Sequence, residues 1–178
     1  MKNLVLIGMP GCGKSTVGVL LAKALGYDFL DTDLVIQRRE GKRLQEIIDG
    51  EGLDAFLAAE AAALRSVEAT HTVIATGGSA VYSPEGMAHL ARRGVIVWLR
   101  VDLPTLKARL GDFAARGIAG VGAKTLDDIF AEREPLYARY AQITVNCAGG
   151  IAGVEQTKQR VLEILAGHSL MLQSNEQE

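Results

Sequence analysis

Short apolar runs alternate along the chain with longer segments whose apolar residues recur at helical spacing. Residues 4–8, 71–78, 95–101 and 143–147 have the length and the branched side chains of buried strands, and residues 28–33 predict a short strand that ends in two carboxylates. Segments of helical composition lie between these runs. This alternation predicts an α/β protein with a parallel sheet, because parallel strands need crossover connections that helices usually supply.

Helical periodicity is clearest directly after the first strand. The apolar residues of segment 14–25 fall on one stripe, and Gly26 is a natural C-terminal stop. Residues 45–67 are rich in Ala, Leu and Glu, which favours helix, with Gly50 and Gly52 dividing the segment. Helices are also expected over residues 34–39, 125–141 and 154–165.

Two segments depart from this pattern. Residues 111–124 contain four glycines among small or apolar neighbours, which predicts a mobile loop. Residues 167–178 are polar and have no firm periodicity, so we expect a frayed tail. Because the chain has 178 residues and no repeat or long linker, we expect a single domain over residues 1–166.

Composition and charge exclude several classes of partner. The chain has 19 basic and 21 acidic residues, so no general attraction to nucleic acid or to an anionic membrane is expected. Cys12 and Cys147 are too few and too far apart for a disulfide framework or a zinc cluster, which suits a reducing cytoplasm. We expect a cytoplasmic protein that acts on a small molecule and needs no obligate protein partner.

The segment GMPGCGKST, residues 8–16, lies between the first predicted strand and the first predicted helix. Gly8, Gly13, Lys14 and Ser15 fit the phosphate-loop pattern GxxxxGK[ST] in the context that the pattern requires. The loop amides and the helix N-terminus would attract phosphate oxygens, Lys14 would reach the β and γ phosphates, and Ser15 would bind magnesium. The predicted nucleotide-binding residues of this segment are Gly11, Cys12, Gly13, Lys14, Ser15 and Thr16.

A phosphate loop alone does not separate kinases from other nucleotide-hydrolysing proteins. A guanine-specific switch protein usually carries an NKxD element, and the chain contains no such tetrapeptide. Motor proteins and helicases are usually larger than this chain of 178 residues. A small kinase is therefore the main hypothesis, and a non-kinase switch NTPase is an alternative.

Four motifs occur in an order that resembles the shikimate kinase family of small phosphotransferases. They are GMPGCGKSTVG at the phosphate loop, DTD at 31–33, TGGSAV at 76–81 and EREPLYARYA at 132–141. The resemblance extends from about residue 4 to residue 165. It implies a three-layer α/β/α P-loop kinase fold of nucleoside monophosphate kinase type, with a central parallel sheet and a mobile lid at about 111–124. It also implies ATP and Mg²⁺ as cofactors, a small hydroxylated acid as acceptor, and a role in amino-acid biosynthesis.

The resemblance gives roles to residues that are otherwise ordinary. Asp31 falls where the family places a carboxylate near magnesium, and Asp33 would take a hydrogen bond or a proton from the attacking hydroxyl. Gly77 and Gly78 match a glycine run whose amides lie against the acceptor. Arg133 matches the arginine that grips the acceptor carboxylate, a role suited to a planar fork of donors. Without these motifs, the aspartate pair would fit a helix cap equally well.

Two further arginines match family positions at the nucleotide. Arg109 corresponds to a residue that flanks the adenine ring. Arg116 corresponds to the lid arginine that meets the phosphates. The family typically has proline after that arginine, whereas this chain has Gly117.

The acceptor site departs from the family pattern at two positions. The family motif FRxxE reads FLAAE at residues 56–60, so Leu57 stands where an arginine supplies half of the clamp on the shikimate carboxylate. Its absence removes a charge-assisted contact worth about 1.5–3 kcal/mol. Ser79 replaces the third glycine of the family's glycine run and adds a side chain where close approach was expected.

The predicted acceptor pocket therefore contains one arginine, Arg133, and one carboxylate, Asp33, which together suit a zwitterion. We predict homoserine as the leading acceptor, giving O-phosphohomoserine, with shikimate, giving 3-phosphoshikimate, as the alternative. Since Asp33 cannot easily serve as both ammonium partner and sole base, Asp31, Glu60 or no base would assist the hydroxyl. Phosphoryl transfer tolerates the last option because it depends chiefly on positioning and charge neutralisation.

Overall fold

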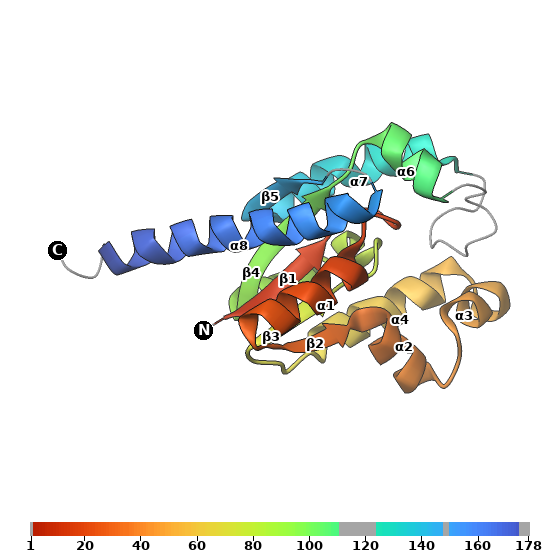
Figure 1. Cartoon of the computed structure of the whole chain (residues 1–178). Coiled ribbons are helices and arrows are strands. Elements are labelled where there is room, and N and C mark those ends of the chain that lie inside the picture. The colour runs from red at the N-terminus through yellow and green to blue at the C-terminus, as the bar shows by residue number, and fades with distance from the viewer. Residues whose placement is uncertain (1, 111–123, 148–149, 175–178) are drawn as a thin grey trace.

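Five parallel strands form the centre of the protein (Figure 1). This computed structural model describes residues 2–110, 124–147 and 150–174. The sheet order is β2-β3-β1-β4-β5, and every pairing is parallel. The strands are β1 (Asn3–Ile7), β2 (Asp28–Asp31), β3 (Thr72–Ala75), β4 (Gly94–Arg100) and β5 (Ile143–Asn146). The predicted parallel sheet and α/β class are thus confirmed.

The register brings three predicted site segments to one edge of the sheet. Central strand β1 is fully buried and pairs with both β3 and β4, with Leu4 opposite Val73 and Val95. Strand β2 pairs with β3 through Asp31 and Ala75. The carboxyl ends of parallel strands share an edge, so the segments that follow β1, β2 and β3 converge there.

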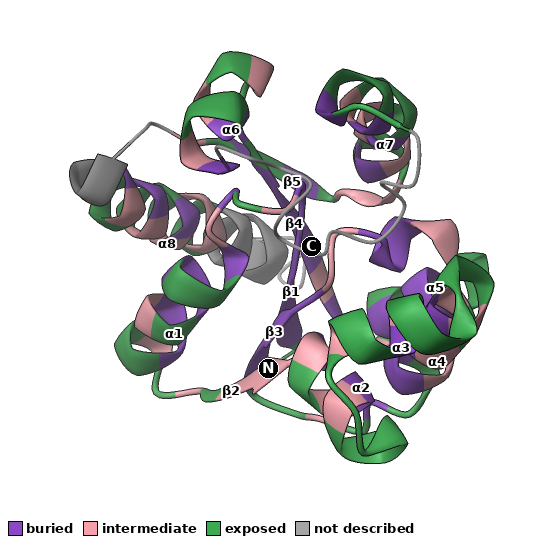
Figure 2. Cartoon of the chain, turned by 90° about the vertical axis from the view of Figure 1, so that its right-hand side faces the viewer, coloured by how far each residue is buried: buried purple, intermediate pink, exposed green. Residues whose placement is uncertain are grey.

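Helices cover both faces of the sheet. Figure 2 shows α1 and α8 on one side of the strands and α4 and α5 on the other. The helices are α1 (Lys14–Leu25), α2 (Thr32–Glu40), α3 (Leu44–Glu51), α4 (Leu53–Arg65), the short 3₁₀ helix η1 (Ala80–Tyr82), α5 (Pro84–Arg93), α6 (Leu103–Leu110), α7 (Leu126–Tyr140) and α8 (Gly150–Ser174). The three-layer α/β/α architecture is the one that the sequence motifs implied.

Two helices differ from their predicted limits. Helix α2 begins at Thr32, two residues early, because the Asp31 side chain caps it by accepting a hydrogen bond from the Asp33 amide at 3.0 Å. Helix α8 continues past Leu165 to Ser174, into the segment expected to be a polar tail. That segment contains no proline, and its glycine, Gly167, is tolerated within a helix at modest cost.

The acceptor side of the molecule has a small hydrophobic cluster of its own. The cluster joins α2, α3 and α4 through Ile36, Ile47, Phe56 and Ala63, and Leu57 packs against it. It is distinct from the main core around the sheet. No helix within the described residues is long and apolar enough to cross a bilayer.

Candidate active site

The phosphate loop curves around its own lysine. Gly8, Gly11 and Gly13 have φ angles of 145°, 77° and 100°, values that favour glycine. Lys14 Nζ donates hydrogen bonds to the carbonyl oxygens of Gly8, at 2.8 Å, and Met9, at 2.9 Å. The loop therefore holds the ammonium group on its inner side, at the N-terminus of α1, where phosphate oxygens are favoured.

Oxygen ligands suited to a magnesium ion lie beside this loop. The Ser15 hydroxyl donates a hydrogen bond to the Asp31 carboxylate, with 2.7 Å between Oγ and Oδ2. Magnesium prefers such hard oxygen ligands and is usually bound by few protein groups together with substrate phosphates. Ser15 and Asp31 thus fit the predicted metal site.

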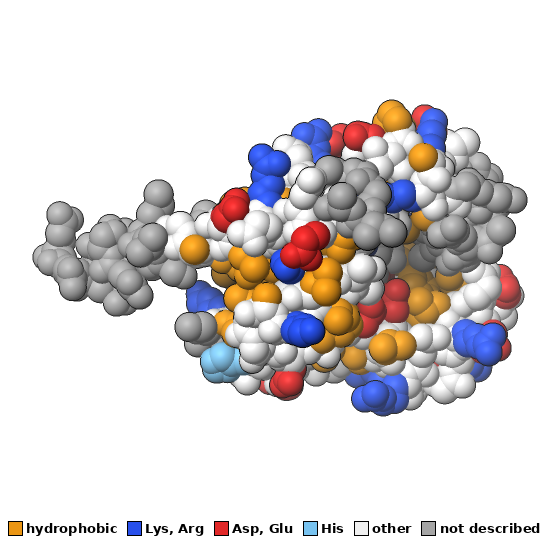
Figure 3. Space-filling view, viewed as in Figure 1, with side chains coloured by type: hydrophobic (Ala, Val, Ile, Leu, Met, Phe, Trp, Pro, Cys, Tyr) orange, Lys and Arg blue, Asp and Glu red, His pale blue; other side chains and the backbone are white. Residues whose placement is uncertain are grey.

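One cavity of about 500 Å³ joins the phosphate loop to the predicted acceptor side. The predicted site residues on its wall are Gly11, Gly13, Lys14, Ser15, Thr16, Asp33, Gly77, Gly78, Ser79 and Arg133. A hollow with acidic and hydrophobic side chains is visible right of centre in Figure 3. The volume lies in the range of small-molecule sites. Loops from distant parts of the chain therefore form one compartment for a phosphate donor and a small acceptor.

Other predicted residues lie beside this cavity or beyond the described residues. Cys12 is buried behind the loop, with Sγ 3.6 Å from Lys14 Nζ. Arg109 Nη1 donates to the Gly11 carbonyl oxygen at 3.2 Å, so its side chain reaches the outer side of the loop. Arg116, with the predicted lid segment up to residue 123, lies outside the described residues.

Leu57 lines a second cavity, of about 350 Å³, whose wall also includes Glu60, Ser79 and Tyr82. The reason is helical geometry. Leu57 is rotated by about 100° from Phe56, which lines the larger cavity, and lies three residues before Glu60, which lines the same second cavity. The structure thus places Leu57 on the wall of the neighbouring cavity, which shares Ser79 with the acceptor cavity, and a role of Leu57 at the acceptor stays a prediction.

The buried carboxyl group of Glu60 and the partly buried one of Asp33 face Gly77. A Cβ atom on Gly77 would lie 3.0 Å from Asp33 Oδ1 and closer still to Glu60 Oε1. Glu60 is 1% exposed, and its Oε1 atom has no hydrogen-bond partner among the described residues. Burial, and to a lesser extent the Asp31 charge, raise the pKa of Asp33 to about 6. Burial also raises the pKa of Glu60 to about 7, and a hydrogen bond with Ser79 opposes this rise.

Ser79 occupies its position without backbone strain. Its φ and ψ angles are −90° and −4°, the values of the third residue of a type I turn, a turn compatible with most residues. The side chain is buried and hydrogen-bonds Glu60. The Ser79 hydroxyl thus partners a buried carboxyl group, and its effect on the approach of the acceptor stays a prediction.

Arg133 is held inside the protein at the acceptor end of the cavity. It is 0% exposed, and its Nε–H donates to the Tyr82 hydroxyl at 3.2 Å. Its Nη1 lies 3.1 Å from the position that a Cβ on Gly78 would take. Among the described residues, Arg133 is the one arginine on the wall of the larger cavity. A guanidinium and the Asp33 carboxyl group therefore face a shared space.

Several cavity residues were not predicted from the sequence. The wall also contains Pro10, Leu44, Phe56, Thr76 and Leu110. Phe56 directly precedes Leu57 in the FLAAE segment, so that motif could have drawn attention to it. Leu44 carries no such signal, since it reaches the site only through the packing of α3.

Comparison with known proteins gives consistent matches. The family model described as shikimate kinase matches residues 10–166. Shikimate kinase 2 of Yersinia enterocolitica serotype O:8 / biotype 1B is 35% identical over 170 residues, which cover 93% of this chain and 96% of that protein. Shikimate kinase of Synechococcus sp. (strain RCC307) is 41% identical over 169 residues, covering 93% of this chain and 85% of that protein.

A solved structure also matches over nearly the whole chain. The structure of shikimate kinase from Acinetobacter baumannii in complex with shikimate superposes with a TM-score of 0.87. It is 30% identical in sequence, and the match covers 96% of both chains.

Proposed function

Because this chain belongs to the shikimate kinase family, we propose that it transfers the γ-phosphoryl group of ATP to a hydroxyl of shikimate, giving 3-phosphoshikimate. The chain is a small-molecule phosphotransferase that uses ATP and Mg²⁺ and acts on an alcohol group. The switch NTPase alternative is not kept. The observation that carries the proposal is the single cavity in which the phosphate loop, Asp33 and Arg133 share one wall.

Shikimate now ranks above homoserine, which was the leading acceptor on sequence grounds. Relatives that match over nine-tenths of this chain are named shikimate kinases, and one matching structure was solved with shikimate. Homoserine remains the second candidate for one reason. Leu57 replaces the family arginine, and the described wall of the cavity offers the acceptor carboxylate one guanidinium, that of Arg133.

The residues of the cavity suggest how the transfer proceeds. Arg133 would bind the acceptor carboxylate, and Lys14 would hold the β and γ phosphates. The acceptor hydroxyl oxygen forms the new bond to the γ-phosphorus as the bond to the leaving ADP oxygen breaks. The hydroxyl proton passes to Asp33, which is mostly ionised at neutral pH because its pKa is about 6.

The metal site has two protein contributors. The Ser15 hydroxyl and the Asp31 carboxylate would hold the ion. When bound, Mg²⁺ supplies positive charge that offsets the charge of the phosphates during transfer.

A coupled ADP-release assay tests the acceptor. Shikimate, homoserine, serine and threonine are compared at saturating ATP and Mg²⁺, and we expect the highest kcat/KM with shikimate. A higher kcat/KM with homoserine would replace shikimate by the second candidate, and stimulation by none of the four would overturn both. Asp33→Asn serves as the control, since loss of the activity in this variant assigns it to the cavity.

A further inference from the structure

Tyr82 makes two contacts with the one arginine on the described cavity wall. Its hydroxyl accepts a hydrogen bond from Arg133 Nε at 3.2 Å, and its ring lies beneath the guanidinium, 5.0 Å from centroid to Cζ. We propose that Tyr82 is a positioning residue that orients Arg133 toward the carboxylate of the acceptor. This inference rests on the proposed function, in which Arg133 binds that carboxylate.

The two contacts fix different degrees of freedom of the guanidinium. The hydrogen bond holds the Nε edge, and the ring contact holds the plane. The opposite edge of the guanidinium is then directed toward Gly77 and Gly78, and its Nη1 atom lies beside Gly78. A long arginine side chain loses considerable rotamer freedom when it binds a carboxylate in a two-pronged geometry. Tyr82 removes part of this cost before the acceptor arrives.

The segment of residues 77–82 carries both the glycines of the acceptor cavity wall and Tyr82. Tyr82 ends η1, which follows directly after Gly77, Gly78 and Ser79. A second link joins this segment to α7, because the Tyr137 hydroxyl donates to the Gly78 carbonyl oxygen at 2.6 Å. The position of Arg133 relative to the glycine amides is therefore set twice, by Tyr82 and by Tyr137.

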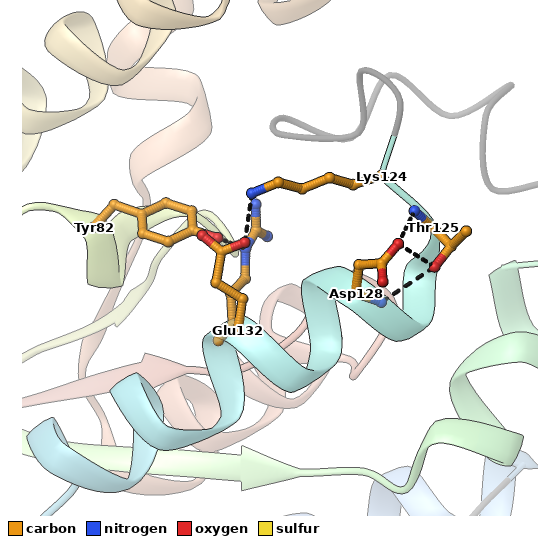
Figure 4. Close-up of polar contacts among 6 residues, drawn as sticks. Tyr82, Lys124, Thr125, Asp128 and Glu132 are labelled. Atoms are coloured by element: carbon orange, nitrogen blue, oxygen red, sulfur yellow. Dashed lines mark hydrogen bonds and ion pairs between the residues drawn. The ribbon is translucent and has the colours of Figure 1, made fainter.

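Neighbouring charges determine which way the Tyr82 proton points. Figure 4 shows Tyr82 reaching toward the Glu132 carboxylate, which also binds Lys124 at 2.5 Å. The hydrogen bond from Lys124 lowers the pKa of Glu132, and a hydrogen bond from Tyr82 lowers it further. Since the Tyr82 hydroxyl donates to Glu132, its oxygen lone pair is left to accept the Arg133 Nε–H. Lys124, Glu132, Tyr82 and Arg133 thus form one chain of hydrogen bonds.

Leu57 explains why this positioning matters in this protein. A site with two arginines could bind a carboxylate even if one of them moved. On the described wall here, Arg133 acts alone. The orientation of one guanidinium then controls the affinity for the acceptor, and the residue that holds it becomes a determinant of acceptor KM.

Tyr82→Phe tests the proposal because it keeps the ring and removes the hydroxyl. We expect the KM for the acceptor to rise about tenfold, with kcat and the KM for ATP within about twofold of wild type. Tyr82→Leu also removes the ring contact and should raise the acceptor KM further. Tyr140→Phe is the matched control, because Tyr140 lies near the end of α7, stacks on Arg139 and is not part of the cavity wall.

A second measurement is independent of the identity of the acceptor. In ¹⁵N-labelled protein, the Nε–H of Arg133 should exchange slowly with water in wild type and at least tenfold faster in Tyr82→Phe. If wild type phosphorylates none of the tested acceptors, this comparison still decides whether Tyr82 holds Arg133. Unchanged exchange would overturn the proposal. Equal rises in both KM values would also overturn it, because they indicate a general structural role.

Discussion

The Ser15 hydroxyl and the Asp31 carboxylate are joined by a hydrogen bond of 2.7 Å. It connects the first turn of α1 to the end of β2, at the carboxyl edge of the sheet. The other oxygen of Asp31 accepts from the Asp33 amide at 3.0 Å and caps α2. One carboxylate therefore orients Ser15, the predicted metal ligand, and also fixes the helix that carries Asp33.

Asp31→Asn should raise the free Mg²⁺ concentration needed for half-maximal activity about tenfold or more. The amide oxygen can still cap α2, but the negative charge beside Ser15 is lost. The measurement is the initial rate against free Mg²⁺ at saturating ATP. Asp28→Asn, at an exposed position on the same strand, is the control and should not change the Mg²⁺ concentration for half-maximal activity. If both variants match wild type, Asp31 does not serve the metal.

Gly77→Ala should destabilise the protein by about 1–3 kcal/mol and raise the KM for the acceptor. The new methyl group would press against the carboxyl groups of Glu60 and Asp33. Gly50→Ala is a matched control within α3, where a Cβ meets nothing within 4 Å, and should stabilise the protein by about 0.5–1 kcal/mol. Urea unfolding measures both changes, and equal midpoints for Gly77→Ala and wild type would contradict the close approach.

Glu60→Gln should alter how stability depends on pH. Burial raises the pKa of Glu60 from 4.5 to about 7, so the folded state binds this proton more tightly than the unfolded chain does. The resulting stabilisation is complete below about pH 4.5 and is lost as the pH rises through 7. The partly buried carboxyl of Asp33, with a pKa of about 6, acts in the same direction.

The variant should therefore lose less stability than wild type between pH 5 and pH 8. The difference in unfolding free energy across this window should be at most on the order of 3 kcal/mol. Thermal unfolding at several pH values within the window measures it. Parallel curves for Glu60→Gln and wild type would show that Glu60 does not titrate with a raised pKa.

Leu57→Arg should lower the KM for shikimate about tenfold or more. The new guanidinium would lie three residues before Glu60 on α4, within reach of its carboxyl group, and on the wall that Ser79 shares with the acceptor cavity. Leu53→Arg, at an exposed position on the same helix, is the control. Steady-state kinetics with shikimate decide the matter: equal KM values for the two variants would argue against a missing clamp.

Local sequence patterns are sufficient to predict the strands, several of the helices and the nucleotide-binding side of the site. Segment 14–25 was predicted as a helix, and α1 spans Lys14–Leu25, because the phosphate loop precedes it and Gly26 ends it in the left-handed conformation. The loop residues are contiguous in sequence, so their spacing alone specifies their geometry. The same holds for Asp31, which ends β2 and caps α2, and for Asp33 in the first turn of α2.

The acceptor side depended on contacts that no local pattern encodes. Tyr82 and Arg133 are 51 positions apart and meet because η1 packs against α7. Whether Leu57 or Glu60 faces Gly77 depends on how α4 is rotated against its neighbouring helices, and that rotation is set by burial of Phe56, Ala63 and Leu64. The sequence by itself determined which chemical groups are present and the order along the chain of the strands that carry them. Only tertiary packing decided which of these groups meet, because side-chain orientation follows from the balance of burial across all contacting elements.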